Sequence, residues 1–278
     1  MSSLTTVFFI AVLTLLGLLF GSFANVVIWR VPRGESVAFP ASHCPVCETP
    51  IAWYDNIPVL SWLSLRGRCR ACAAPIARRY PLVEIASGSL ALTAALAYGP
   101  APRAVFAAVL FWFLLVLSMI DIEHYRLPNV LVAALAVVGV VGVALGSFLR
   151  VPVVPLLDGG ANALFTAPYA NAIAGAVIGA GLSGAIAAVY ALARGRQGLG
   201  MGDIKLLGVL GVFLGPLVVV SLFLGSLIGL IVGIASARGS RFADARIPFG
   251  PSLAAAAVIT ALVGPVLWER YLVMLGVG

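Results

Sequence analysis

Charged residues are scarce in this chain. They make up 10% of its 278 residues, against about 25% in soluble domains, whereas hydrophobic residues make up 62%. So few charges cannot cover a globular surface in water, which excludes a soluble enzyme. The excess of apolar residues excludes a disordered chain and a fibrous repeat. The composition therefore predicts a polytopic membrane protein.

Apolar runs divide the chain into eight segments that we expect to form about eight transmembrane helices in an all-α fold, since a crossing helix needs about 20 residues. The runs are at residues 4–28, 82–98, 104–120, 130–148, 171–193, 204–214, 217–235 and 253–275. The sixth run is too short to span a bilayer unaided, so we expect a short crossing there. No internal repeat is evident.

The only sizeable polar stretch, residues 30–80, separates the first apolar run from the others. With 51 residues it is too small to bury much core of its own. The sequence therefore predicts three parts: a first transmembrane helix at 1–29, an insert at 30–80 and a transmembrane core at 81–278.

Lysine and arginine are distributed unevenly among the loops, and such residues accumulate on the cytoplasmic side of a membrane. Fourteen of the seventeen follow odd-numbered runs, which leaves only Arg103, Arg150 and Arg270 elsewhere. This asymmetry predicts a cytoplasmic insert and both termini outside. The net charge of +7 is thus mainly a topology signal, and the expected partner is the lipid bilayer rather than a nucleic acid.

All four cysteines lie in the insert, as two Cys-x-x-Cys pairs separated by 21 residues. Each pair can direct two thiolates at one ion, and two pairs complete a tetrahedron. We therefore expect a closed, structural zinc site of the zinc-ribbon type, made by Cys44, Cys47, Cys69 and Cys72. Free thiols in a metal-free loop are the alternative, and His43 is expected to be a bystander.

Two aspartates lie at ends of apolar runs that the predicted topology places on the cytoplasmic face. Asp121 closes the third run, and Asp203 directly precedes the sixth. Two carboxyl groups in one site share a proton, so one can activate water while the other donates to a carbonyl. Caps at helix ends, or a cation site in a transporter, are the alternatives.

Four other residues support this candidate site. Gly200 and Gly202 leave room for backbone to bend close to Asp203. Lys205 is expected to pair with Asp203 or to extend its amine to the membrane interface. Glu84 begins the second run, where a carboxylate is expected to meet a cation such as Arg79 or a substrate amine.

Short motifs follow one another in order along nearly the whole chain. They are GSFANVVIWR at 21–30, SHCPVC at 42–47, WYDNIPVLSW at 53–62, RGRCRAC at 66–72, RYPLVE at 79–84, ID at 120–121, GMGDIK at 200–205 and IPFGP at 247–251. This ordered set resembles the type IV prepilin peptidases, which are bifunctional leader peptidases/N-methyltransferases of the GxGD aspartyl protease type. A departure from the family pattern is Asn129, where many relatives have an aspartate.

The resemblance implies a bacterial inner-membrane endopeptidase whose catalytic pair is Asp121 and Asp203. Its substrates would be type IV prepilins and type II secretion pseudopilins, cut after a glycine to remove a basic leader. It also implies methylation of the new N-terminal amine by S-adenosylmethionine, an activity associated with the insert. No residue pattern identifies the methyl-donor site. The rival functions are a proton- or cation-coupled transporter and a non-catalytic zinc-ribbon assembly factor.

Overall fold

The structure, a computed structural model, describes residues 3–151, 153–154, 156, 167–196, 198–236 and 248–274. Within these ranges all regular elements are helical, and the only β pairing consists of two isolated bridges in the insert. The expected all-α fold is therefore confirmed. Arg238, Arg241 and Arg246, which contribute to the predicted sidedness, lie outside the described residues.

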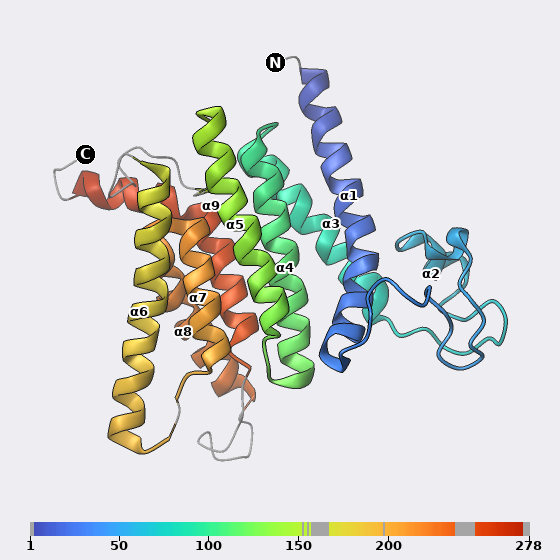
Figure 1. The fold of residues 1–278 in the computed structure, drawn as a ribbon. Coiled ribbons are helices and arrows are strands. Elements are labelled where there is room, and N and C mark those ends of the chain that lie inside the picture. The colour runs from blue at the N-terminus through green and yellow to red at the C-terminus, as the bar shows by residue number, and fades with distance from the viewer. Residues whose placement is uncertain are drawn as a thin grey trace. The chain divides into compact units, whose positions relative to one another are not determined.

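Long helices occupy all eight predicted apolar runs (Figure 1). They are α1 (Ser3–Arg30), α3 (Arg79–Tyr98), α4 (Pro102–His124), α5 (Asn129–Leu149), α6 (Pro168–Arg194), α7 (Met201–Leu214), α8 (Val218–Ser236) and α9 (Gly250–Met274). Shorter elements are the 3-10 helices η1 (Val31–Arg33), η2 (Trp53–Asn56) and η3 (Gly215–Leu217), and α2 (Leu60–Ser64).

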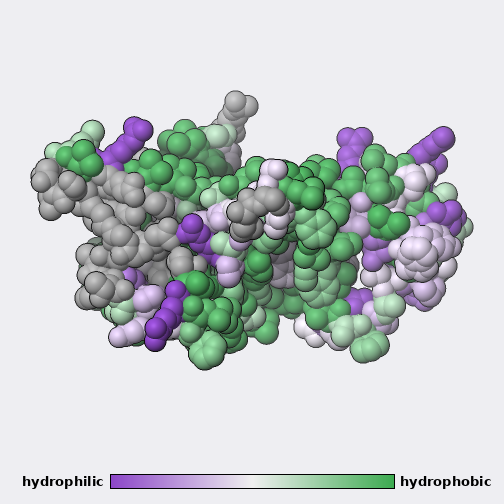
Figure 2. All heavy atoms as spheres, turned by 90° about the horizontal axis from the view of Figure 1, so that it is seen from above, coloured by the Kyte–Doolittle hydropathy of each residue, from purple (hydrophilic) through white to green (hydrophobic). Residues whose placement is uncertain are grey.

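Six helical stretches of the described chain are long and apolar enough to cross a membrane, and α7, η3 and α8 count together as one of them. Hydrophobic residues cover much of the helix surface that is coloured in Figure 2. A soluble protein could not expose so much apolar surface without association. The protein is therefore a multi-pass membrane protein.

The chain forms two compact units, Met1–Ile120 and Asp121–Gly278. In the first unit α1 packs against α3. The Ser87 hydroxyl donates a hydrogen bond of 2.6 Å to the Gly17 carbonyl, and a small core forms around Leu13, Ala91 and Ala95. In the second unit α6 packs against α7, and α8 against α9.

The contact of α6 with α7 depends on the absence of side chains. Gly175 and Gly179 on α6 form a Gly-x-x-x-Gly pair, a spacing that lets membrane helices approach closely. A Cβ atom on Gly175 would collide with the Gly211 carbonyl oxygen of α7 and would lie 2.6 Å from the Gly215 carbonyl. This close approach fixes the axis of α7, the helix that carries Asp203.

The predicted shortness of the sixth segment is also seen. α7 has 14 residues, or about 21 Å at the usual helical rise, and η3 follows it directly. Gly215 ends α7 at a φ of 57°, which glycine adopts without strain. A helix of this length is shorter than the hydrocarbon core of a bilayer. The position of Asp203 at the start of α7 is therefore set by the packing of α7 against α6, and not by the length of α7.

Candidate functional site

Asp121 and Asp203 line the same cavity of about 630 Å³ within the second unit. Asp121 stands in the last turn of α4, and Asp203 in the first turn of α7. The structure thus brings together two carboxyl groups that lie 82 positions apart in the sequence.

Asp121 is held by the start of α9. The backbone N–H of Gly250 donates a hydrogen bond of 2.9 Å to the Asp121 Oδ2 atom. A Cβ atom at position 250 would lie only 2.7 Å from the same oxygen, so the contact requires glycine. Sequence reasoning assigned no role to Gly250, although its IPFGP motif was a visible signal.

Asp203 is held by the turn that begins α7. Gly200 is the N-cap residue, and its carbonyl accepts a bond of 3.1 Å from the Asp203 N–H. A side chain at Gly200 would press on Asp203, since its Cβ would lie 2.9 Å from Oδ2. Gly202 packs against Leu127. The role of these glycines in letting backbone approach Asp203 closely stays a prediction.

The cavity walls are mostly apolar and come from several helices. Ile186, Ala187 and Tyr190 of α6 and Leu222, Gly229 and Leu230 of α8 line it, together with Tyr125, Pro248 and Phe249. Ile186 and Leu230 are half exposed on the surface of the unit. A cavity with two acids and apolar walls of this kind suits an apolar peptide segment whose backbone reaches the acids. The tyrosines and Phe249 were not among the predicted site residues.

Lys205 and Glu84 have partners that the sequence did not indicate. The Lys205 ammonium donates a bond of 3.1 Å to the Asn129 side-chain oxygen. Glu84, in the first unit, is buried and accepts a bond of 2.7 Å from the backbone N–H of Val59. Val59 has a φ of 63°, which is strained for a β-branched residue, so the Glu84 carboxyl holds an unusual turn of the insert.

The four cysteine sulfurs of the insert form one cluster and lie within 4.8 Å of one another. The Sγ atoms of Cys44 and Cys72 are 3.8 Å apart. Zinc–sulfur bonds of about 2.3 Å in a tetrahedron place sulfurs about 3.8 Å apart, whereas a disulfide needs about 2.05 Å. The geometry therefore fits a four-thiolate metal site better than disulfides.

The thiols of this cluster are affected unequally by their surroundings. The side chain and then the backbone of Thr49 lower the pKa of the Cys47 thiol to about 6. Within the same cluster the backbone of Ala74 lowers the pKa of the Cys72 thiol, but burial and the neighbouring thiols together raise it to about 12, so the metal-free cluster does not hold four thiolates.

The two cysteine pairs lie in turns of the same design. The Cys44 N–H donates to Thr49 and the Glu48 N–H to Cys44, and the Cys69 N–H donates to Ala74 and the Ala73 N–H to Cys69. Glu48 and Ala73 both have positive φ. The sequence Cys-x-x-Cys-x-x-Pro thus recurs after 25 residues. Sequence analysis missed this short repeat because only the cysteines and the proline are shared.

An ion pair braces the second turn. Arg70, between Cys69 and Cys72, donates bonds of 2.7 and 2.6 Å to the two oxygens of Asp55 in η2. This hydrogen bonding lowers the pKa of the Asp55 carboxyl. The two parallel hydrogen bonds fix the orientation of the Arg70 side chain relative to the cysteine turn.

Two family models match the chain in succession. The bacterial peptidase A24 N-terminal domain matches residues 15–98, and the type IV leader peptidase family matches residues 108–234. No solved structure shows a significant match.

Curated relatives match over nearly their whole length. A prepilin leader peptidase/N-methyltransferase of Stutzerimonas stutzeri is 35% identical, with 95% of this chain and 94% of that protein covered. The protein of the same name from Pseudomonas aeruginosa is 33% identical over 96% of this chain and 95% of its own. A type 4 prepilin-like proteins leader peptide-processing enzyme of Escherichia coli is 34% identical, covering 88% and 90%.

Proposed function

Because the chain belongs to the type IV leader peptidase family, we propose that Asp121 and Asp203 hydrolyse the leader of a prepilin or pseudopilin within the cavity that they share. The observation that carries this proposal is the convergence of the two carboxyl groups beside apolar walls. A transporter would place such acids near the middle of its helices, commonly where a helix is broken. Here they stand in the last turn of α4 and the first turn of α7.

The chemistry follows from two carboxyl groups that share one proton. The ionised member removes a proton from water as the water oxygen bonds to the scissile carbonyl carbon, and the protonated member donates to the carbonyl oxygen. When the resulting tetrahedral intermediate breaks down, the first carboxyl gives its proton to the leaving nitrogen. The second carboxyl regains a proton from a hydroxyl group of the intermediate. The C–N bond breaks, releasing the leader acid and a new N-terminal amine.

The substrate would be an apolar helix that carries a basic leader. Its apolar part suits the walls made by α6 and α8, and a glycine before the cut leaves the backbone free to extend. In this proposal both acids and the insert lie on the cytoplasmic side of a bacterial inner membrane, with the termini outside. Gly200 and Gly202 would shape the turn at Asp203, Lys205 would fix the start of α7 through Asn129, and Glu84 would hold the insert turn at Val59.

Methylation of the product is the second activity that the relatives' names indicate for this chain. The new amine would bond to the methyl carbon of S-adenosylmethionine as the carbon–sulfur bond breaks, giving S-adenosylhomocysteine, and the amine would lose a proton to solvent. None of the described residues that line the peptidase cavity is a cation suited to the donor's carboxylate. The donor is therefore expected to bind outside this cavity.

The direct test uses purified protein, a synthetic prepilin and mass spectrometry. We expect one cut after the glycine, a released leader, and a mature product that gains one methyl group only when S-adenosylmethionine is present. An uncut substrate would contradict the peptidase proposal and favour a transporter or an assembly factor. A cut product that stays unmethylated would contradict the second activity alone.

We further propose that Cys44, Cys47, Cys69 and Cys72 hold a structural zinc ion. A metal supplies the stability that so small an insert cannot gain from its own core. Replacing Cys69 by serine is therefore expected to reduce the zinc content from one ion per chain to near zero and to expose the insert to proteolysis. Metal analysis and limited proteolysis measure both effects.

The matched control for this change is Ala71→Ser, which alters an exposed residue of the same turn without removing a sulfur. It should keep its zinc and its resistance to protease. Wild-type protein that purifies from zinc-containing medium without the metal would overturn the assignment, as would a Cys69→Ser protein that still binds zinc stoichiometrically.

A further inference from the structure

The insert exposes large apolar side chains although it is the only sizeable polar stretch of the chain. Four of them are called the exposed apolar group: Trp53 and Tyr54 of η2, and Leu60 and Leu63 of α2, which are between 50% and 81% exposed. η2 packs against α2, and the two aromatic rings meet edge to face. Exposed apolar surface of this kind commonly marks a contact with another protein or with a membrane.

Hydrogen bonds hold the leucines of this group outward by fixing the opposite side of α2. Ser61 is buried, and its hydroxyl accepts a bond of 2.9 Å from the Ile57 N–H and donates one of 3.0 Å to the Tyr54 carbonyl. The Trp62 indole N–H donates a bond of 3.1 Å to the Ile76 carbonyl. Because Ser61 and Trp62 are bonded to the rest of the insert, the two leucines cannot turn inward without breaking these bonds.

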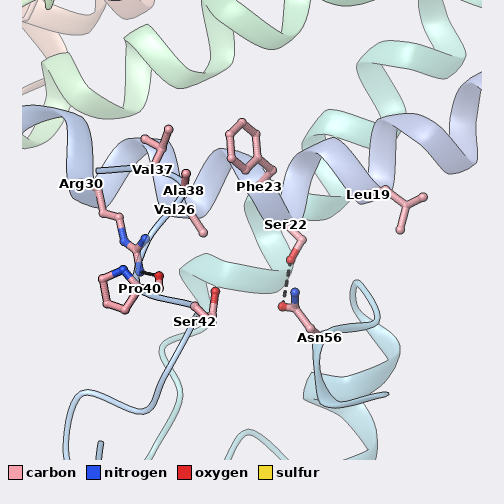
Figure 3. A pocket seen from close by; sticks show the side chains of 11 residues that line it. Leu19, Ser22, Phe23, Val26, Arg30, Val37, Ala38, Pro40, Ser42 and Asn56 are labelled. Carbon is pink, nitrogen blue, oxygen red and sulfur yellow. Dashed lines mark hydrogen bonds between the residues drawn. The ribbon is translucent and has the colours of Figure 1, made fainter. Parts of the chain in front are cut away.

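A hydrogen bond places η2 beside the apolar part of α1. The Ser22 hydroxyl donates a bond of 3.3 Å to the Asn56 side-chain oxygen, and Figure 3 shows Ser22 directed from α1 toward Asn56. Ser22 lies eight residues before Arg30, the last residue of α1, which is about 12 Å along the helix. Spacings of four and three residues put Leu15, Leu19 and Ser22 on one face of α1, and both leucines are more than half exposed. η2 therefore continues an apolar surface that a membrane-spanning helix turns to lipid.

A second hydrogen bond gives a similar depth relative to α3. The Val59 N–H donates a bond of 2.7 Å to the Glu84 carboxyl, and Glu84 lies five residues, or about 7.5 Å, after Arg79 at the start of α3. The headgroup layers take up about 10–15 Å of a bilayer about 40–45 Å thick, so each is about 5–8 Å deep. The turn between η2 and α2 is thus level with the boundary between headgroups and acyl chains.

We propose that the exposed apolar group is inserted into the lipid bilayer at this boundary and anchors the insert to the membrane surface. Tryptophan and tyrosine favour the boundary, because their rings are apolar whereas their N–H and O–H groups remain hydrated. Amphipathic segments that lie on a membrane bury their apolar side about 5–10 Å deep, which agrees with the depth of η2 and α2. Arg66 and Arg68 follow α2 and are exposed, and such cations suit the anionic headgroups of phospholipids.

The test is photochemical cross-linking of the full-length, zinc-loaded protein in vesicles of phosphatidylethanolamine and phosphatidylglycerol. Replacing Leu63 by p-benzoylphenylalanine puts a photoreactive ketone in the exposed apolar group. The matched control carries the same replacement at Val46, an apolar residue that is 70% exposed and lies in the first cysteine turn. We expect about fivefold more phospholipid adduct at position 63 than at position 46, as contact with the acyl boundary requires. Zinc content verifies the fold of both variants.

A second measurement uses the fluorescence of Trp53. Trp53→Phe changes one exposed ring, so the difference in emission between the wild type and this variant isolates the indole at that position. Phospholipid brominated at the start of its acyl chains should quench this difference by about half or more, because an interfacial indole lies at that depth. Acrylamide dissolved in the water should quench it much less.

Equal phospholipid adducts at positions 63 and 46 would overturn the inference, as would a Trp53 emission that acrylamide quenches and brominated lipid does not. Adducts that join position 63 to a second copy of the chain, without lipid adducts, would make the exposed apolar group a dimer contact and would also overturn it. Leader cleavage is measured separately, so none of these results decides the proposed peptidase activity.

Discussion

Replacing Asp121 or Asp203 by asparagine is expected to slow leader cleavage by about 10²- to 10⁴-fold, because an amide can neither remove the proton from water nor supply one to the carbonyl. Asparagine has nearly the same shape as aspartate, and in the Asp121→Asn protein its side-chain oxygen can still accept the Gly250 N–H bond. Folding and substrate binding should therefore persist. Single-turnover cleavage of a synthetic prepilin separates the chemical step from binding.

A carboxyl-to-amide change elsewhere controls for the loss of charge itself. Glu35 is an exposed residue of the first unit and does not line the carboxyl cavity, so Glu35→Gln should cleave at the wild-type rate. The double variant, Asp121→Asn with Asp203→Asn, should be little slower than either single variant, since the two groups act as one unit. Cleavage by a folded single variant at more than a tenth of the wild-type rate would show that the pair is not the catalytic centre.

Replacing Gly175 by alanine is expected to destabilise the protein by about 1–3 kcal/mol, the usual cost of overpacking a tight contact. The added methyl group would meet the Gly211 and Gly215 carbonyls, which belong to backbone and cannot rotate away. The melting temperature in detergent should fall by several degrees, at about 2–4 °C per kcal/mol for a chain of 150–250 residues. Cleavage should slow as well, because α7 would shift and carry Asp203 with it.

Gly184 provides the matched control on the same helix. A Cβ atom there meets nothing within 4 Å, so Gly184→Ala should leave cleavage unchanged and raise the melting temperature slightly, through the lower conformational entropy of alanine. If Gly175→Ala melts at the wild-type temperature and cleaves normally, then α6 and α7 are not held by this glycine contact.

The helices could be predicted from sequence because the bilayer imposes one length and one chemistry on every crossing segment. All eight apolar runs are helical, and most of the helices extend one to four residues beyond the predicted run at one or both ends, whereas α8 begins and α9 ends one residue inside its run. Helix α7 begins at Met201 and not at the predicted Ile204, because Gly200 is its N-cap residue and Asp203 belongs to its first turn. Sidedness and the three-part division of the chain remain predictions.

The carboxyl pair could be predicted because the expected topology placed both residues at the same face, whereas their supports could not. The bond from Gly250 to Asp121 depends on where α9 starts relative to α4, and no local pattern encodes that position. The same is true of Glu84 and Lys205, whose partners, Val59 and Asn129, lie 25 and 76 positions away. A charged side chain indicates that a partner is needed, but tertiary packing selects it.

The support for Asp121 comes from a main-chain amide, and this has a consequence for how the enzyme can change. A side chain that positions an acid can be deleted or exchanged by one mutation, whereas the N–H at position 250 is lost only with proline, although any side chain added there would press on the Asp121 carboxyl. Selection at position 250 would therefore act on the size of the side chain rather than on its functional group. Neighbouring Phe249 lines the cavity, so a substitution there would change the space for substrate without removing the N–H that anchors the acid.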